Sequence, residues 1–202
     1  MLIVTDAADS HAIITKEQAK TELSITGTAQ DALLEDLVKD ASAIIAGYCG
    51  RDTFALETVE QTERLQRASA GLILARELNC TITSVEVDGV ALTDDEWERD
   101  GAILYRLDAS DRRILWPCGA KIVITYSAGY TVGTDVPDII RRAALDALTV
   151  LYNGRGRDVT VRSEQTEGVG ETQYFDGRRA DVPPISADRL AALDRFRRLS
   201  VG

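Results

Sequence analysis

The chain has 202 residues, of which 45% are hydrophobic and 28% charged. These are ordinary globular proportions, and they argue against wholesale disorder or a fibrous repeat. Lys and Arg number 23 against 33 Asp and Glu, which gives a net charge of -10. Such a charge argues against a protein that coats nucleic acid or an anionic membrane with its whole surface. The length fits one domain of roughly 100–200 residues, or slightly more.

The charge is divided unevenly along the chain. Residues 1–140 carry 12 basic and 24 acidic side chains, whereas residues 141–202 carry 11 Arg, no Lys and 9 acids. The three cysteines lie far apart, which indicates a reducing compartment rather than a disulfide framework. Since no signal peptide or apolar run of about 18 residues is present, we expect a soluble intracellular product.

Two helices are predicted near the N-terminus. The segment Thr15-Lys16-Glu17-Gln18 is a capping box and predicts a short helix that ends near Ser24. A second helix is predicted from Thr28-Ala29-Gln30-Asp31. Its apolar positions follow spacings of three and four, at Leu34, Leu37, Ala41, Ile44 and Tyr48. Such a stripe must face a partner helix.

Between residues 53 and 130 the apolar pattern alternates, which predicts antiparallel strands. Asp88-Gly89 is a favoured two-residue hairpin turn. The expected strands are residues 81–87, 90–92, 102–107, 112–116 and 121–127. The acidic run from Asp94 to Asp100 is read as a solvated loop between two of these strands.

The chain returns to helix after residue 136. Val136-Pro137-Asp138 starts a helix that ends near Tyr152 and should pack on the helix at 28–48. Residues 154–185 resemble an extended arm, and Ser186 should cap a terminal helix. The sequence therefore predicts an α+β fold, with a helical domain at 1–153, a β insertion at about 53–130, and an arm with a terminal helix at 154–202.

The residue types needed for catalysis are scarce. The only histidine, His11, lies in an N-terminal segment that we expect to be mobile, and no phosphate-binding glycine loop occurs. We therefore predict no enzyme activity, no cofactor and no metal. A rival hypothesis is a small metal-dependent nuclease that uses the 94–100 run, and it requires Asp95 and Glu96. Against it, the run lacks the central glycine of a calcium loop.

The arginine-rich C-terminal part suits a protein interface, where Arg is enriched. An alternative is a DNA-binding regulator whose affinity falls steeply with salt. The apolar side of the terminal helix could dock on its own core or contact another protein, and we favour the second. The candidate portal or subunit contacts are Tyr174, Phe175, Arg189, Leu190, Leu193, Arg195, Phe196, Arg197 and Arg198.

Five segments between residues 13 and 153 carry a family resemblance through their order and spacing. They are Ile14 to Lys20, Asp31-Ala32-Leu33-Leu34, Val85 to Val90, Ile124 to Tyr130, and Val136-Pro137 with the helix ending Leu151-Tyr152. In this order the sequence resembles the head-tail adaptor (connector or head completion) proteins of tailed double-stranded DNA bacteriophages.

The resemblance implies a structural virion protein, made in the host cytoplasm, that joins the filled capsid to the tail. Its expected partners are the portal protein, a tail or neck protein, and further copies in a ring of probable twelvefold symmetry. Double-stranded DNA would pass through the ring without specific binding, and no membrane is involved. A neck stopper or tail-completion protein is the alternative within this setting. We further hypothesise that acids of the first 140 residues line the channel while Arg195, Arg197 and Arg198 reach the portal.

Overall fold

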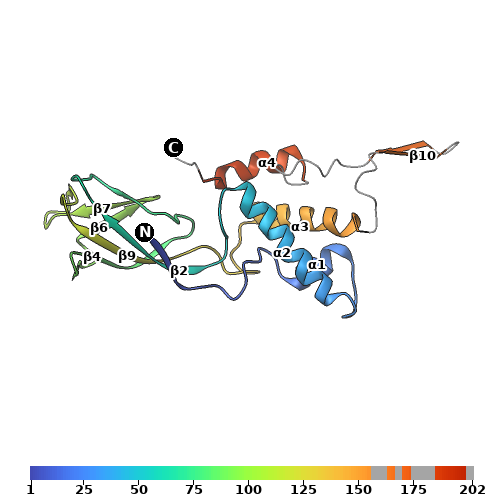
Figure 1. Cartoon of the computed structure of the whole chain (residues 1–202), viewed down its shortest axis with the longest axis horizontal. Helices are drawn as coiled ribbons and strands as arrows, with labels where there is room; N and C mark the ends of the chain where they lie inside the picture. The colour runs from blue at the N-terminus through green and yellow to red at the C-terminus, as the bar shows by residue number, and fades with distance from the viewer. Residues whose placement is uncertain (156–162, 167–169, 174–184, 199–202) are drawn as a thin grey trace. The chain divides into compact units, whose positions relative to one another are not determined.

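The structure is a computed structural model that describes residues 1–155 and 185–198, with the backbone of 163–166 and 170–173. It confirms the predicted α+β class. The chain divides into two compact units (Figure 1). The β unit comprises Met1–Asp9 and Ala55–Tyr130, and the helical unit comprises Ser10–Phe54 and Thr131–Gly202. The predicted insertion therefore has its own core, and the N-terminal residues belong to it.

The helical unit begins with α1 (Lys16–Leu23) and α2 (Asp31–Tyr48). The predicted capping box is present: the Gln18 amide donates to Thr15 Oγ1 at 3.2 Å, and the Thr15 amide donates to Gln18 Oε1 at 2.9 Å. α1 ends at Ser24, whose φ of 54° is left-handed. Both predicted helices are thus confirmed, including their ends.

α3 (Asp138–Asn153) packs against α2 and also contacts α1. The face of α3 that contains Ile140, Ala144 and Leu148 is buried. The residues of α2 that are buried beside it are Leu34, Leu37, Val38, Ala41, Ser42, Ile45 and Ala46. The expected packing of these two helices is confirmed.

The β unit contains two antiparallel sheets. The larger has the strand order β1-β2-β9-β4-β5. Its strands are β1 (Leu2–Asp6), β2 (Glu57–Arg64), β9 (Lys121–Ala128), β4 (Thr81–Val87) and β5 (Val90–Ala91). The smaller sheet has β7 (Ile103–Leu107) at its centre. Its other strands are β3 (Leu72–Ile73), β6 (Trp97–Asp100) and β8 (Arg113–Ile114).

One hydrophobic core joins residues of the two sheets. It contains Val59 and Ile124 from the larger sheet, Leu104 from the smaller one, and Trp116. The Trp116 side chain is fully buried, and its indole N–H donates to the Leu104 carbonyl at 3.2 Å. A buried indole needs such an acceptor, because an unpaired polar group is costly in a core.

Most of the predicted strands are confirmed, and β4 has the predicted bounds. The Asp88-Gly89 turn is present, with φ of 53° and 83°, as a type I′ turn requires. One expectation is corrected. Residues 97–100 form β6 rather than a loop, because they pair with β7. The N-terminal segment before His11 also contains a strand that was not predicted, because residues 2–6 form β1 and pair with β2.

The C-terminal part is described in pieces. The predicted arm at 154–185 lies mainly outside the described residues. Its described parts are residues 154–155, residue 185, and the paired strands β10 (Ser163–Thr166) and β11 (Gly170–Gln173). The predicted terminal helix is present as α4 (Ala187–Leu193), followed by a 3-10 turn at Asp194–Phe196. Across the described ranges, no helix combines the length and apolar character needed to cross a membrane.

Candidate functional site

The terminal segment, defined as residues 185–198, docks on the helical unit. Leu193 is completely buried, Ile185 is nearly so, and α4 contacts α3. The apolar face of this segment therefore covers the protein's own core. Its apolar side was expected to bind another protein, so the described contacts favour the docking alternative for Leu193.

Polar groups fix the end of this segment against the C-terminal end of α2. The Tyr48 hydroxyl donates to Asp194 at 2.8 Å, and Arg51 Nε donates to the Phe196 carbonyl at 2.8 Å. The Arg198 amide donates to the Cys49 carbonyl, also at 2.8 Å. These bonds satisfy carbonyl and hydroxyl groups at the point where α2 ends.

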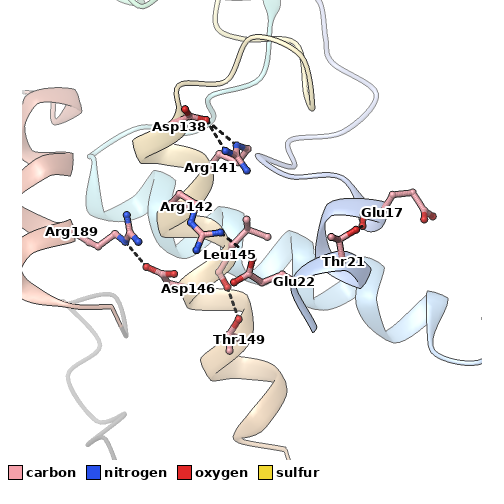
Figure 2. A network of polar contacts seen from close by, with 10 residues as sticks. All are labelled: Glu17, Thr21, Glu22, Asp138, Arg141, Arg142, Leu145, Asp146, Thr149 and Arg189. Atoms are coloured by element: carbon pink, nitrogen blue, oxygen red, sulfur yellow. Dashed lines mark hydrogen bonds and ion pairs between the residues drawn. The ribbon is translucent and has the colours of Figure 1, made fainter. Parts of the chain in front are cut away.

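α3 holds α1 on one side and α4 on the other (Figure 2). Arg142 of α3 pairs with Glu22 of α1 at 3.0 Å. On the other side, Asp146 of α3 pairs with Arg189 of α4 at 2.5 Å. α3 is therefore the element that positions the terminal segment relative to the N-terminal helices.

The predicted contact residues thus have different environments. Leu193 and Arg189 contact their own chain, and Leu190 and Phe196 are half-buried. The side chains of Arg195, Arg197 and Arg198 are exposed. Tyr174 and Phe175 lie outside the described residues. Contact of any of these residues with a portal or subunit stays a prediction.

An acidic depression lies on the β unit, with a volume of about 410 Å³. Its lining residues are Asp94, Asp95, Trp97, Glu98, Leu107, Asp108, Ala109 and Asp111. Arg113 pairs with Glu98, and Arg112 pairs with Asp108 at 3.2 Å. The side chains of Trp97, Leu107 and Ala109 make part of this carboxylate-rich surface apolar.

Local hydrogen bonds keep several of these carboxyls ionised. Backbone amides of Ser110 and Arg112 bind the Asp108 carboxylate and lower its pKa. Bonding from the Thr93 side chain similarly lowers the pKa of Asp95. The depression is therefore negatively charged at neutral pH. The sequence singled out residues 94–100 and also predicts a turn at 108–111, but it did not indicate that the two lie side by side. The pairing of β6 with β7 brings them together.

A family model described as "Head completion protein" matches residues 12–198. The chain belongs to the head completion protein family. The match spans both units and includes the terminal segment. It confirms the family predicted from the sequence and, with it, a location at the head-tail junction of a virion.

Solved structures with the same fold come from gene transfer agent (GTA) particles. One is a chain from the neck of an empty GTA particle with C6 symmetry, with 19% identity and a TM-score of 0.58. Others come from the virion of a native GTA particle, with 17% identity, and from the neck of a native particle with C12 symmetry, with 16% identity, both with TM-scores of 0.58. In each case the match covers 100% of this chain and 98% of the other. No curated protein matches.

As a head completion family member, the chain has a structural role in a virion. Within the described part of the chain, no group of three or more His, Cys, Asp or Glu residues is placed to hold a metal ion. Within the acidic run from Asp94 to Asp100, the Glu96 carboxylate already accepts hydrogen bonds from the Thr93 amide and hydroxyl, at 2.8 and 2.9 Å. No observation on this surface favours the nuclease hypothesis.

Proposed function

We propose that this chain is a head-to-tail adaptor that forms a ring under the portal and joins the DNA-filled capsid to the tail or neck. The observation that carries the proposal is the head completion family match, because it extends over residues 12–198 rather than over one unit. The family model therefore covers residues of both units and the terminal segment.

The solved structures with this fold support a ring of twelvefold symmetry. They are chains from the virion or neck of GTA particles, with C6 or C12 symmetry in two cases. A chain with the same fold and nearly the same length fits the same kind of assembly. Closed rings need two different faces on each subunit, and a chain with two dissimilar units supplies dissimilar surfaces.

The charge of the chain suits a channel that DNA must pass. Residues 1–140 carry twice as many acids as bases. A wall of like charge denies the duplex the counterion release that drives tight binding. We therefore assign acids of this part to the channel side, and the exposed terminal arginines to contacts with the portal or a neighbouring subunit.

The proposal is tested by mixing the purified chain with the portal of the same particle and imaging the product by electron microscopy. A ring stacked under the portal is the expected result. If a portal that is competent for assembly recruits no such ring, the adaptor role is overturned, and binding to the completed neck would instead identify a stopper or tail-completion protein.

A further inference from the structure

Two arginines of the terminal segment have side chains without a carboxylate partner among the described residues. Arg189 and Arg197 pair with Asp146 and Asp194, respectively. No ion pair within the described ranges involves the side chains of Arg195 and Arg198, and both are exposed. The Arg198 amide is nevertheless held by the Cys49 carbonyl, so the backbone that carries both guanidinium groups is anchored.

The acidic depression of the β unit, in contrast, contains carboxylates without a cationic partner in residues 1–155 and 185–198. Asp94, Asp95 and Asp111 have no cation within ion-pair distance in the part of the chain that the structure describes, and Trp97 lies beside them. A guanidinium group suits such a surface, because it can stack on an indole and bind carboxylates with two parallel hydrogen bonds. The volume of the depression, about 410 Å³, lies within the range of ligand pockets.

We propose that Arg195 and Arg198 of one copy bind the acidic depression of the next copy, so that subunits associate head to tail. The inference rests on the proposed ring function and names the contact that orients its subunits. A second copy fits for two reasons. The two surfaces are complementary in charge, and they lie on different units of the chain, as a heterologous interface requires.

Duplex DNA is a less suitable occupant for the two arginines. Non-specific DNA binding depends on neutralising many phosphates, and the chain as a whole has a net charge of -10. Charge pairs between subunits mainly fix register and partner choice, and both are needed when identical subunits must close a ring.

The test uses two variants of the full chain, each with one surface neutralised. R195A/R198A keeps the acidic depression, and D94N/D111N keeps the arginines. Asn is chosen because it tolerates the left-handed φ of 59° at Asp111. Sedimentation velocity is measured over a protein concentration series at about 0.02 M and about 0.5 M NaCl, since screening should weaken the contact at the higher salt.

We expect the wild-type chain to form species larger than dimers at low salt and to dissociate at high salt. Each variant alone should associate at least about tenfold more weakly, because one of its two surfaces no longer binds. An equimolar mixture of the two variants should form dimers that grow no further. R64A/R67A removes two exposed arginines from the β unit and should associate as the wild type does.

Three results would overturn the proposal. They are a wild-type chain that stays monomeric at low salt up to millimolar concentration, undiminished association of R195A/R198A, or a variant mixture without dimers. Loss of duplex DNA binding in R195A/R198A with unchanged self-association would assign the arginines to DNA instead. If one of these results is found and the portal still recruits the wild-type chain as a ring, the adaptor role stands and only this contact is wrong.

Discussion

The three thiols of the chain differ in environment. Cys49 and Cys80 are buried, and burial raises the pKa of each to about 11. Cys118 is exposed. Of the three thiols, only that of Cys118 is accessible to solvent.

We therefore predict that iodoacetamide modifies the native chain at Cys118 alone near pH 8, within the range where free thiols react. Peptide mapping by mass spectrometry measures the modified positions, and C118S serves as the control that should remain unmodified. Modification of Cys49 in the native chain would contradict the prediction. It would also indicate that the terminal segment detaches, because Arg198 binds the Cys49 carbonyl.

Gly129 has a backbone position that no other residue fits. Its φ is 114°, and a Cβ atom there would lie 2.1 Å from the Ala55 carbonyl oxygen. We predict that Gly129→Ala lowers the free energy of unfolding by more than about 3 kcal/mol, from backbone strain together with overlap. Thermal or denaturant unfolding measures the change.

Gly89 provides the matched control. It also has a positive φ, 83°, but an added Cβ would meet no atom within 4 Å. Gly89→Ala should therefore lower the free energy of unfolding only by the cost of placing a side chain at a left-handed φ, about 1–2 kcal/mol. If Gly129→Ala and Gly89→Ala lower the free energy of unfolding equally, the close approach of Gly129 to Ala55 does not explain the loss.

At the scale of elements, α1 is attached to α2 by ion pairs. Lys20 and Lys16 contact Asp31 at 2.6 and 3.1 Å. Hydrogen bonds from Lys20 and then Lys16 lower the pKa of Asp31. A carboxyl whose pKa is lowered by folding stabilises the folded state fully at pH values above its pKa in the unfolded state, which is near 4. This stabilisation is lost as the pH falls through the pKa of the folded state.

We predict that Asp31→Asn destabilises the chain at neutral pH, and that its effect shrinks towards the acid end of a pH series, where the wild-type carboxyl is also protonated. Urea unfolding over a pH series gives the difference between the two proteins. A difference that stays constant over the whole series would mean that packing rather than charge explains the loss.

The terminal segment is attached by the buried side chains of Ile185 and Leu193, by three hydrogen bonds at the end of α2, and by the ion pair between Arg189 and Asp146. Leu193→Ala should cost about 2–5 kcal/mol of its docking, and Tyr48→Phe about 1 kcal/mol, because the latter removes one hydrogen bond. Hydrogen exchange of residues 187–198 measures docking locally, with Ala191→Ser as the exposed control. If Leu193→Ala leaves this exchange unchanged, Leu193 does not hold the segment.

The elements that the sequence predicted well depend on neighbouring residues. The capping box at Thr15 and the turn at Asp88-Gly89 are complete within four and two residues, respectively. β2 was not singled out, because its inner face carries Glu57 and Gln61, which are buried at 4% and 2% exposure. Their partners, Arg76 for Glu57 and Tyr126 for Gln61, come from distant parts of the chain. Polar residues in a core break the alternating pattern from which a strand is predicted.

The acidic depression could likewise not be predicted from neighbouring residues alone. Its two acidic stretches are more than ten residues apart, and only strand pairing brings them together. The terminal arginines were identified from composition, but their division into paired and unpaired side chains needed the structure. Short-range signals predict elements, whereas surfaces depend on how those elements pair.

At the scale of the whole molecule, the β unit enters and leaves the helical unit at adjacent points. Ala55 forms a β-bridge with Tyr130, and the Leu56 amide donates to the Tyr130 carbonyl at 3.0 Å. Inserted units with close ends are commonly tolerated or removable. The helical unit should thus be able to form without the insertion.

We predict that residues 10–54 joined to 131–202 through a short Gly/Ser linker fold into a helical protein. Circular dichroism and a cooperative thermal transition are the measurements, with the full chain as reference. A helical signal without cooperative melting would show that the helical unit needs the β unit to complete its structure.

The division of the chain also affects how it responds to proteases. The backbone passes between the units three times, between residues 9 and 10, 54 and 55, and 130 and 131. A single cut at one junction therefore leaves the two units covalently linked through the other two. A nicked chain would give fragments on a denaturing gel, yet it would keep its full mass in native mass spectrometry.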